Sequence, residues 1–400
     1  MILDIKEAAE PAKEPTICGL RKNTFWIVLS FVLLMIIAVA VGGGVGGSLA
    51  NKKSNDSTST TSDNTSSNGS SSETTATVIP LISNTSLASI NWTDADGTSN
   101  YHVFYQLSTG ALAQSAWNTS TRTWTTHPVA PASPLIKNGT PIAASLYWHN
   151  ASRRSYQLYW LDPTNAVRGL LSNNAPLGPF APSSVDGRYT AGPGSSLASY
   201  GRACPDCLDA NAVAFVDVDD RLRLAVNTPW ALTAANATVE VASGGAVALA
   251  PVAASAGPRR LALFVGAGET GNLTRVLWDG EAWASETLPT ALERDAAVAA
   301  FAYGYNGTEG FSMQAVSSKA EGADGVGVTA FDQGADAWNS STDAGAGGTS
   351  MQSIAAGSAL AANQAGRVYG FVGNGSLGEW VWDSGNGYSF NGWVNTTVVS

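Results

Sequence analysis

The sequence is poor in charged residues and in cysteine, and each shortage argues against a class of protein. Only 13% of its 400 residues are charged, about half the usual share, which disfavours a coiled coil or a charged disordered chain. A net charge of -10 leaves no basic surface to neutralise phosphates, which argues against nucleic acid as a partner. Three cysteines are too few for a disulfide-built scaffold.

Glycine and aromatic residues are what the chain has instead. It contains 42 Gly and 13 Trp, and 9% of its residues are aromatic. Such a composition is typical of short strands joined by turns. The length fits two or three average domains, or one large all-β domain with appendages.

The N-terminal part predicts a membrane anchor. Residues 1–23 are polar, whereas residues 24–41 contain no charge over 18 positions, and a glycine-rich continuation lengthens the uncharged run. This predicts a transmembrane signal-anchor helix over residues 24–46, long enough for a bilayer core of about 30 Å. A cleaved signal peptide ending at Ser48-Leu49-Ala50 is the alternative, but the apolar run exceeds the usual ~7 to 15 residues.

The positions of the N-glycosylation sequons predict the orientation of the membrane anchor. All of them lie after the apolar segment, which predicts a cytosolic tail at residues 1–23 and an extracellular or lumenal C-terminal part in the plasma membrane or secretory pathway. Chance in a Ser/Thr-rich chain explains several of them. The fourteen begin at Asn55, Asn64, Asn68, Asn84, Asn91, Asn118, Asn138, Asn150, Asn236, Asn272, Asn306, Asn339, Asn374 and Asn395.

Residues 47–79 are rich in Ser, Thr and Asn and nearly free of large apolar side chains between positions 51 and 77. Such a segment buries too little to offset the entropy of ordering. It is expected to form a disordered stalk that carries O-linked sugars. Residues 80–400 are therefore the only part expected to bury a sizeable core.

This C-terminal part contains six similar units. A branched apolar residue followed by two small or apolar ones recurs at intervals of 55, 55, 50, 51 and 56 residues. The six phrases are Leu87-Ala88-Ser89, Ile142-Ala143-Ala144, Leu197-Ala198-Ser199, Val247-Ala248-Leu249, Val298-Ala299-Ala300 and Ile354-Ala355-Ala356. Internal repeats of this period indicate a stacked or circular array.

A second, strand-like phrase follows 14 to 16 residues later in five units. It begins at Val103, Leu158, Val213, Leu261 and Val368. Turn residues and a third apolar position come next, and an aromatic closes each unit: Trp124, Phe180, Trp230, Trp283, Trp338 and Tyr388. The pattern therefore predicts four strands in each unit. Because such a unit cannot bury both faces alone, the six units are expected to form a six-bladed β-propeller of four-stranded antiparallel blades.

With the phrases aligned, residues 81–400 resemble the fungal fucose-specific lectin family of six-bladed propellers. Leu87-Ala88-Ser89-Ile90-Asn91-Trp92 and the stretch 142–148 carry the family's blade opening, and Val103-Phe104-Tyr105-Gln106 carries its second strand. The resemblance implies a non-catalytic carbohydrate-binding protein, with fucosylated glycans as partners and no cofactor or metal. It also implies a sugar between adjacent blades, held by an Arg, a Glu and an aromatic of the next blade.

Only the last unit keeps both charged partners. The Arg position falls on His102, Gln157, Ala212, Arg260, Ser312 and Arg367, and the Glu position on Gln114, Gly169, Leu224, Arg275, Ala330 and Glu379. The resemblance therefore implies one intact pocket, formed by Arg367 and Glu379 with Trp124 from the first unit. The weaker candidates are His102 and Gln114 with Phe180, then Arg260, then Trp338.

Other interpretations stay open beside the lectin. Arg367 and Glu379 form a surface ion pair under the plainest alternative, worth ~0.2 to 1 kcal/mol and needing no ligand. A propeller that has lost sugar binding and serves as a protein-interaction scaffold is a second function. A glycosidase, which needs paired carboxylates, is a third, supported only by an incomplete Ser-x-Asp-x-Gly box at residues 341–345.

The remaining polar clusters are read as structural. Cys204 and Cys207 lack a second cysteine pair or a nearby histidine, so a local disulfide is favoured over a metal or redox site. Asp217, Asp219 and Asp220 stand where a hairpin turn is needed, which favours a solvated turn over a calcium site.

Overall fold

The computed structural model describes Thr16–Ile17, Leu20–Arg21 and residues 77–399, the last range with gaps at 228–229, 235–238, 240, 242–244, 253–259, 268–270, 280, 294, 306–309, 320–323 and 342–349. The chain divides into two compact units, Met1–Ser72 and Glu73–Ser400. In the first unit, β1 (Thr16–Ile17) pairs antiparallel with β2 (Leu20–Arg21). The predicted membrane segment and nearly all of the predicted stalk lie outside the described residues. Within the described ranges, no helix has the length and apolar character needed to span a bilayer.

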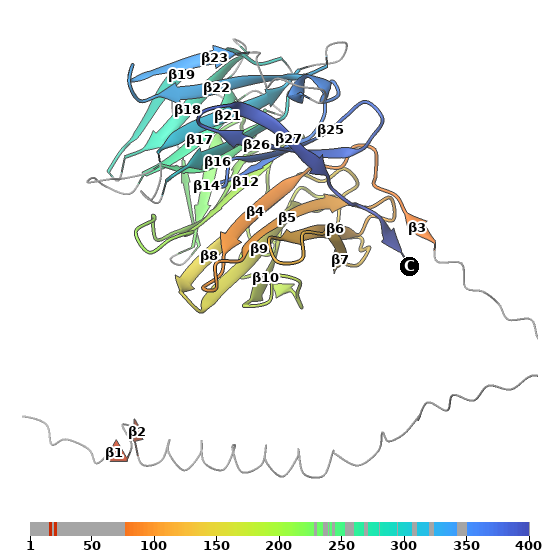
Figure 1. Cartoon of the computed structure of the whole chain (residues 1–400). Coiled ribbons are helices and arrows are strands. Elements are labelled where there is room, and N and C mark those ends of the chain that lie inside the picture. The colour runs from red at the N-terminus through yellow and green to blue at the C-terminus, as the bar shows by residue number, and fades with distance from the viewer. Residues whose placement is uncertain are drawn as a thin grey trace, which may run out of the picture. The chain divides into compact units, whose positions relative to one another are not determined.

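Six four-stranded sheets follow one another along the second unit, each with antiparallel neighbours in chain order (Figure 1). Blade 1 holds β4 (Ala88–Thr93), β5 (Ser99–Gln106), β6 (Leu112–Asn118) and β7 (Thr125–Ala130); blade 2 holds β8 (Ile142–Asn150), β9 (Arg153–Leu161), β10 (Val167–Asn173) and β11 (Ala181–Pro182); blade 3 holds β12 (Leu197–Gly201), β13 (Asn211–Val216), β14 (Leu222–Val226) and β15 (Ala231–Ala234). Blade 4 holds β16 (Val247–Val252), β17 (Arg260–Ala267), β18 (Asn272–Trp278) and β19 (Trp283–Ala291); blade 5 holds β20 (Val298–Tyr303), β21 (Ser312–Ser318), β22 (Val326–Asp332) and β23 (Ala337–Ser341); blade 6 holds β24 (Leu360–Asn363), β25 (Arg367–Phe371), β26 (Leu377–Asp383) and β27 (Gly387–Trp393).

The first strands of the six blades form a ring around the axis. Each contacts the first strand of the next blade, and β24 contacts β4, so the ring closes. The predicted six-bladed propeller is confirmed. Small residues such as Ala198, Ala248 and Ala299 occupy these strands and are buried, because converging blades leave little room for side chains near the axis.

The hydrophobic core is divided among the seams between blades. Buried clusters join blades 1 and 2, 2 and 3, 3 and 4, 4 and 5, 5 and 6, and 6 and 1. At the last seam, for example, Val103 and Tyr105 of blade 1 pack with Tyr369 and Leu377 of blade 6. Each sheet thus buries both faces only because it has two neighbours, as the repeat argument expected.

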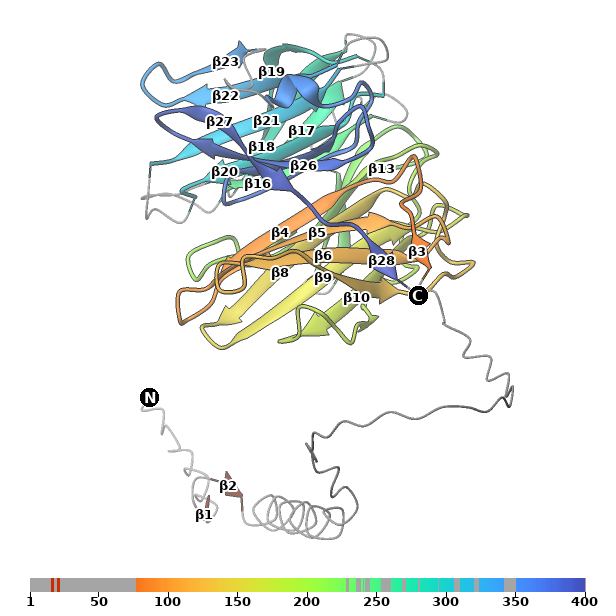
Figure 2. The same cartoon turned by 45° about the vertical axis from the view of Figure 1, so that its right-hand side comes forward.

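The two ends of the propeller are held together beside blade 1. Strand β3 (Val78–Ile79) pairs antiparallel with β28 (Val398–Val399), and Figure 2 shows the two side by side. The Thr126 hydroxyl donates to the Thr397 carbonyl oxygen at 2.8 Å. Nearer the axis, Asn363 Nδ2 of blade 6 donates to Ser89 Oγ of blade 1 at 2.9 Å. These bonds fix the seam at which the chain closes on itself.

Five of the six predicted opening phrases lie in or at the start of a first strand, but the sixth is wrong. Ile354 follows a short 3-10 helix, η1 (Met351–Ser353), and forms only an isolated bridge with Val372. The first strand of blade 6 is β24, which carries a similar phrase, Leu360-Ala361-Ala362. Ile354 instead lies fully buried in the cluster between blades 5 and 6. Two similar apolar stretches begin six residues apart, at Ile354 and Leu360. Only the second one forms the first strand, because the first directly follows η1 and lies outside the sheet.

Candidate functional site: the seams between blades

The cross-strand register identifies equivalent positions in the six blades. A central residue of each second strand pairs with the candidate Glu position of the third: Phe104 with Gln114, Tyr159 with Gly169, Ala214 with Leu224, Phe264 with Arg275, Gln314 with Ala330, and Tyr369 with Glu379. In blade 6, Arg367 stands two residues before Tyr369. The same offset gives Ala262 in blade 4, so the assignment of Arg260 is wrong by two residues. Arg260 is exposed at the start of β17.

Arg367 and Glu379 meet at the seam between blades 6 and 1. Arg367 Nη1 donates to Glu379 Oε1 at 2.5 Å, and the two side chains are 12% and 2% exposed. Glu379 also accepts from the Tyr369 hydroxyl at 2.9 Å and from Asn391 Nδ2 at 2.5 Å. The pair is therefore a buried network, which differs from the surface ion pair of the alternative interpretation.

Blade 1 supplies the aromatic surface of this seam. The guanidinium carbon of Arg367 lies 3.5 Å from the ring centroid of Tyr101 and 5.3 Å from that of Trp117. Trp124, the aromatic predicted from the sequence, instead meets Tyr369 edge-on, with centroids 6.4 Å apart. Tyr101 and Trp117 were missed. Strand alternation could have found Tyr101, because it shares a face with Val103 and Tyr105.

The guanidinium and the phenol of this network keep their protons near neutral pH. Burial alone would lower the pKa of Arg367, but the charge and hydrogen bond of Glu379, together with Tyr369 and Tyr101, outweigh it, and the pKa lies above its ordinary value. Burial, followed by the neighbouring Glu379 charge, raises the pKa of Tyr369 well above its ordinary value. The guanidinium thus stays charged and the phenol stays protonated, so each donates a hydrogen bond to the same carboxylate oxygen.

The structure brings His102 and Gln114 of blade 1 together, but it buries both of them away from solvent. His102 Nδ1 lies 2.9 Å from Gln114 Oε1, and both side chains are buried. Gln114 Nε2 donates to the Pro176 carbonyl oxygen at 3.1 Å. Burial lowers the pKa of His102 to about 4, so the ring is neutral. Phe180 packs, half-buried, in the cluster between blades 1 and 2. These residues form a neutral structural contact at the seam.

Blade 4 contains a charge pair that the sequence argument did not foresee. Arg275, assigned as a charge of the wrong sign at the Glu position, lies directly opposite Glu286 of the fourth strand. Its Nη2 is 2.7 Å from Glu286 Oε2, and its guanidinium carbon is 5.3 Å from the ring centroid of Trp338 in blade 5. A guanidinium, a carboxylate and an aromatic of the next blade therefore also meet between blades 4 and 5.

At the other three blades the Arg and Glu positions carry no charge. Gln157 accepts from the Tyr159 hydroxyl, Ala212 and Leu224 belong to the cluster between blades 3 and 4, and Ser312 accepts from Gln314 Nε2 at 3.1 Å. These positions contribute to packing and internal hydrogen bonding in their blades.

Asp217 belongs to a turn. Its Oδ1 accepts from the backbone nitrogens of Asp219 and Arg221 at 2.9 Å and 3.0 Å, and its Oδ2 accepts from Arg223 Nε at 2.5 Å. In the described part of the chain, no group of three or more His, Cys, Asp or Glu side chains is arranged to hold a metal. Cys204 and Cys207 are joined by a disulfide bond in the loop between β12 and β13.

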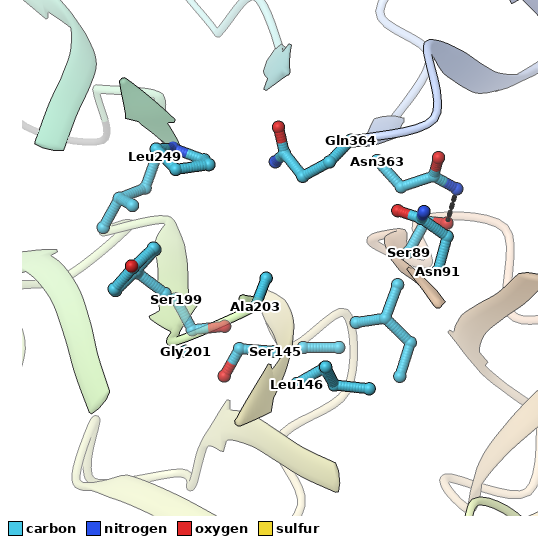
Figure 3. Close-up of a pocket in the computed structure, with 14 residues that line it drawn as sticks. Ser89, Asn91, Ser145, Leu146, Ser199, Gly201, Ala203, Leu249, Asn363 and Gln364 are labelled. Atoms are coloured by element: carbon cyan, nitrogen blue, oxygen red, sulfur yellow. Dashed lines mark hydrogen bonds between the residues drawn. The ribbon is translucent and has the colours of Figure 1, made fainter. Parts of the chain in front are cut away.

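A small polar cavity lies on the propeller axis (Figure 3). Ser89, Asn91, Ser145, Ser199 and Asn363 line it, and its volume is about 60 Å³. That volume admits a few water molecules and is well below the roughly 300 Å³ of small-molecule pockets. The axis is therefore not a sugar site.

The described sequons differ in accessibility. Exposed asparagines are Asn84, Asn138, Asn150, Asn339, Asn374 and Asn395, and half-buried ones are Asn91, Asn118 and Asn272. Asn91 lines the axial cavity. Asn55, Asn64, Asn68, Asn236 and Asn306 lie outside the described residues, as do positions 342–345 of the incomplete glycosidase box.

Comparisons with known proteins agree with the fold. The chain matches no protein-family model and no curated protein sequence. Solved structures do match it. The Aleuria aurantia lectin in complex with alpha-methyl-L-fucoside gives a TM-score of 0.63 at 18% identity, covering 80% of this chain and 98% of the lectin.

Two further solved structures align over similar lengths. SapL1 lectin in complex with alpha methyl fucoside gives a TM-score of 0.61 at 18% identity, over 79% of this chain and 98% of that one. AofleA from Arthrobotrys oligospora gives 0.58 at 13% identity, over 81% and 89%. The expected resemblance is thus confirmed for the fold: residues 77–399 form the six-bladed propeller seen in the Aleuria aurantia lectin.

Proposed function

We propose that the propeller binds carbohydrate, without catalysis, at the seam between blades 6 and 1. The observation that carries the proposal is the meeting of Arg367, buried Glu379 and the aromatic residues Tyr101 and Trp117 at one seam. Glu379 holds the guanidinium in place, and the guanidinium is the more exposed of the two charged groups. Sugar hydroxyls accept charge-assisted hydrogen bonds from it, while a C–H face of the sugar lies against Trp117.

Fucosylated glycans are the proposed ligands. The structures of the Aleuria aurantia lectin and of SapL1, which share the fold, were determined with methyl fucosides. A binding role fits the chemistry of the seam better than hydrolysis does. Among the described residues, Glu379 is the only carboxylate bonded to Arg367 and both of its oxygens already accept hydrogen bonds. A glycosidase needs two carboxyl groups that can exchange protons.

The proposal also places this propeller at a membrane. The uncharged stretch at residues 24–46 serves as a single anchor, residues 1–23 lie in the cytosol, and the predicted stalk, which ends before β3 (Val78–Ile79), is glycosylated. The sequence supports this arrangement through one apolar run of sufficient length and sequons only beyond it. In sealed vesicles that keep the cytosolic face inside, protection of the tail from added protease tests this arrangement. A mass loss of the rest of the chain on deglycosylation tests the position of the sugars.

A fucosylated glycan array probed with the full-length chain tests the sugar site. We expect binding by the wild type and a loss of at least about tenfold for Arg367→Ala and for Arg367→Lys, which keeps the charge but not the planar fork. Arg154→Ala is a matched control, because Arg154 also forms an ion pair across two blades, with Asp94 at 3.0 Å. An array without signal for the wild type would reject the proposal.

The burial of Glu379 favours one second candidate, a propeller that acts as a protein-interaction scaffold. A carboxylate that is 2% exposed cannot contact a ligand without rearrangement, in contrast to the open site that a lectin needs. Binding of a purified protein partner that excess free fucose leaves unchanged, combined with a silent glycan array, would select this function over sugar binding.

A further inference from the structure

The outermost strand of each blade is an open sheet edge. Each sheet ends in its fourth strand, which is β7, β11, β15, β19, β23 or β27, and in the part of the chain that the structure describes no further strand pairs with any of them. Open edges promote pairing between molecules, and natural proteins prevent it with proline or with charged residues in the edge strand. The six edges are therefore comparable by their sequences.

Three of the edges have this usual protection. β7 contains Pro128, β11 contains Pro182, and β19 contains Glu286 and Pro289. A proline has no N–H group to offer to a pairing strand, and a charge on an edge strand is costly to bury in an intermolecular sheet. Blades 1, 2 and 4 are thus protected by the amino acids of the strand itself.

The other three edges contain neither proline nor a charged residue, and each is accompanied by a sequon. The strands are β15 (Ala-Leu-Thr-Ala), β23 (Ala-Trp-Asn-Ser-Ser) and β27 (Gly-Tyr-Ser-Phe-Asn-Gly-Trp). Asn339 lies within β23 and Asn395 lies two residues after β27, whereas Asn236, two residues after β15, is outside the described residues. β7, β11 and β19 have no sequon within two residues of either end. Sequons therefore occur at the edges that lack the usual protection.

Asn339 faces solvent at the periphery of the propeller, where β23 lies in both views (Figures 1 and 2). The preceding residue, Trp338, is buried in the cluster between blades 4 and 5. Successive side chains of a strand alternate between its two faces, so Asn339 points away from that cluster. Its pairing with Ala330 of β22 fixes its position on the outermost strand. A substituent on Asn339 Nδ2 therefore lies at the open edge of blade 5.

Asn395 is held in a fixed geometry beside the edge of blade 6. Its Oδ1 accepts from the Thr397 backbone nitrogen at 3.0 Å, and its carbonyl oxygen accepts from the Ser115 hydroxyl of blade 1 at 2.5 Å. Trp393 is 49% exposed, while Val394, between Trp393 and Asn395, is buried. Trp393 and Asn395 thus face the same side, about 7 Å apart along the chain. A first sugar on Asn395 reaches the ring and lays its C–H face against it.

We propose that N-linked glycans at Asn339 and Asn395 protect the outer edges of blades 5 and 6 from pairing with a second copy of the chain, and that the first sugar at Asn395 packs on Trp393. On attachment, Nδ2 loses a proton and bonds to the anomeric carbon of an oligosaccharide, whose bond to a lipid pyrophosphate breaks with its electron pair going to the pyrophosphate. The bulky, hydrated glycan then keeps another strand away. The inference rests on the proposed lumenal placement of the propeller and is independent of sugar binding by it.

Substitution of the asparagines in the full-length chain, produced in cells that attach N-glycans, tests the protective role. Asn339→Gln with Asn395→Gln removes both glycans, and we expect the mean protein mass in detergent solution, measured by light scattering, to at least about double. Asn339→Lys with Asn395→Lys also removes both glycans but supplies a charge at each edge, and is expected to keep the wild-type mass. Asn150→Gln with Asn374→Gln is the matched control. These two sequons lie in turns, and their loss should leave the mass unchanged.

Enzymatic trimming of the glycans tests the contact with Trp393. An endoglycosidase that leaves the first N-acetylglucosamine on Asn395 should keep the Trp393 ring protected from oxidation. An amidase that removes the whole glycan should raise its oxidation rate at least about threefold, because the ring loses its cover. Peptide mass spectrometry reports each tryptophan separately. Trp382 is half-buried in the same blade and should oxidise at the same rate after both treatments.

Each contrary outcome has a definite meaning. Glycans at other sequons but none at Asn339 or Asn395 overturn the inference and leave the lumenal placement intact, whereas a chain without any glycan rejects the placement as well. A wild-type mass for the double glutamine variant overturns the protective role. Equal association of the glutamine and lysine variants also overturns it, because loss of the glycans then acts on folding. Equal oxidation of Trp393 after both enzymes overturns the packing contact.

Discussion

Two seams contain the same kinds of side chain, an Arg, a Glu and aromatic rings of the next blade. They differ in solvent exposure: the carboxylate is buried between blades 6 and 1 and half-exposed between blades 4 and 5. At the first, Glu379 is buried and bonded on both oxygens, and the guanidinium lies on Tyr101. At the second, Glu286 is half in solvent, and Arg275 Nε and Trp338 Nε1 form no hydrogen bond with any residue that the structure describes. Displacement of the pair by one strand outward accounts for the difference, because inner strands are covered by both neighbouring blades.

This comparison shows that an Arg–Glu pair in a propeller seam has two separable roles. A buried pair is costly to desolvate, and the loss of one member leaves the other charge buried without a partner, so the closing seam depends on both members being present. A half-exposed pair contributes little to stability and is available to a ligand. Which role dominates depends on the distance from the axis.

The largest expected effect concerns the stability of the closed seam. Glu379→Ala leaves the Arg367 guanidinium buried without its carboxylate, and we expect a loss of about 3 to 5 kcal/mol of unfolding free energy. Glu286→Ala removes a half-exposed partner and is expected to cost less than about 1 kcal/mol. Urea unfolding of the two variants measures both values. Equal losses would remove the distinction between the two seams.

A pH titration extends the comparison to the neutral His102–Gln114 contact, which lies beside the seam between blades 1 and 2. The folded-state pKa of His102 is lowered to about 4, below the ordinary 6.5, so the unfolded chain binds the extra proton between these pH values. Stability is then complete above pH ~6.5 and falls as pH drops toward 4, by roughly 3 kcal/mol for this group. His102→Gln should lose less stability over the same interval. An identical pH slope in the variant would show that His102 is not the titrating group.

The hydrogen bond within the closed network gives the next effect. Tyr369→Phe removes the donor 2.9 Å from the Glu379 carboxylate, and we expect a cost of about 1.5 to 3 kcal/mol. Tyr105→Phe is a matched control, because Tyr105 is equally buried and its hydroxyl meets the neutral Ser115 hydroxyl at 2.9 Å. That change should cost about 0.5 to 1.5 kcal/mol. Thermal unfolding distinguishes the two, and a larger loss at Tyr105 would contradict a charged network at the closing seam.

Salt is expected to produce the smallest effect. At 1 M ionic strength the screening length is about 3 Å, so the contribution of the exposed Arg275–Glu286 pair should vanish, while that of the buried Arg367–Glu379 pair should largely remain. Unfolding of Glu286→Gln and Glu379→Gln at low and high salt checks this. Equal salt dependence in both variants would mean that the two pairs are equally solvated.

Much of the fold was predictable because its signals are local. Alternating apolar residues, turn residues and a closing aromatic recur within each unit, and they correctly predicted the four strands of blades 1 to 3. Errors occurred where two apolar runs compete. Leu261-Ala262-Leu263 and Leu263-Phe264-Val265 fit a second strand equally well, and only the pairing of Phe264 with Arg275 selects the register.

The candidate site was only partly predictable, for a related reason. Arg367 and Glu379 lie on adjacent strands of one blade, so their proximity follows from a hairpin. Tyr101 and Trp117 reach the guanidinium across a seam between residues at least 250 positions apart. Strand alternation groups Tyr101 with Val103 and Tyr105, but no local pattern specifies that Trp117 also reaches blade 6, or that Glu286 neutralises Arg275 from the fourth strand.

The amino-acid sequence alone determined that six four-stranded units follow one another and must stack in a ring, because strand periodicity and turn chemistry act within a few residues and each unit has two apolar faces. The tertiary structure decided which seams hold a charge pair, how deeply each pair is buried and which rings touch it. Those properties depend on the register of strands and on the approach of one blade to the next, and both are set by packing across the whole ring.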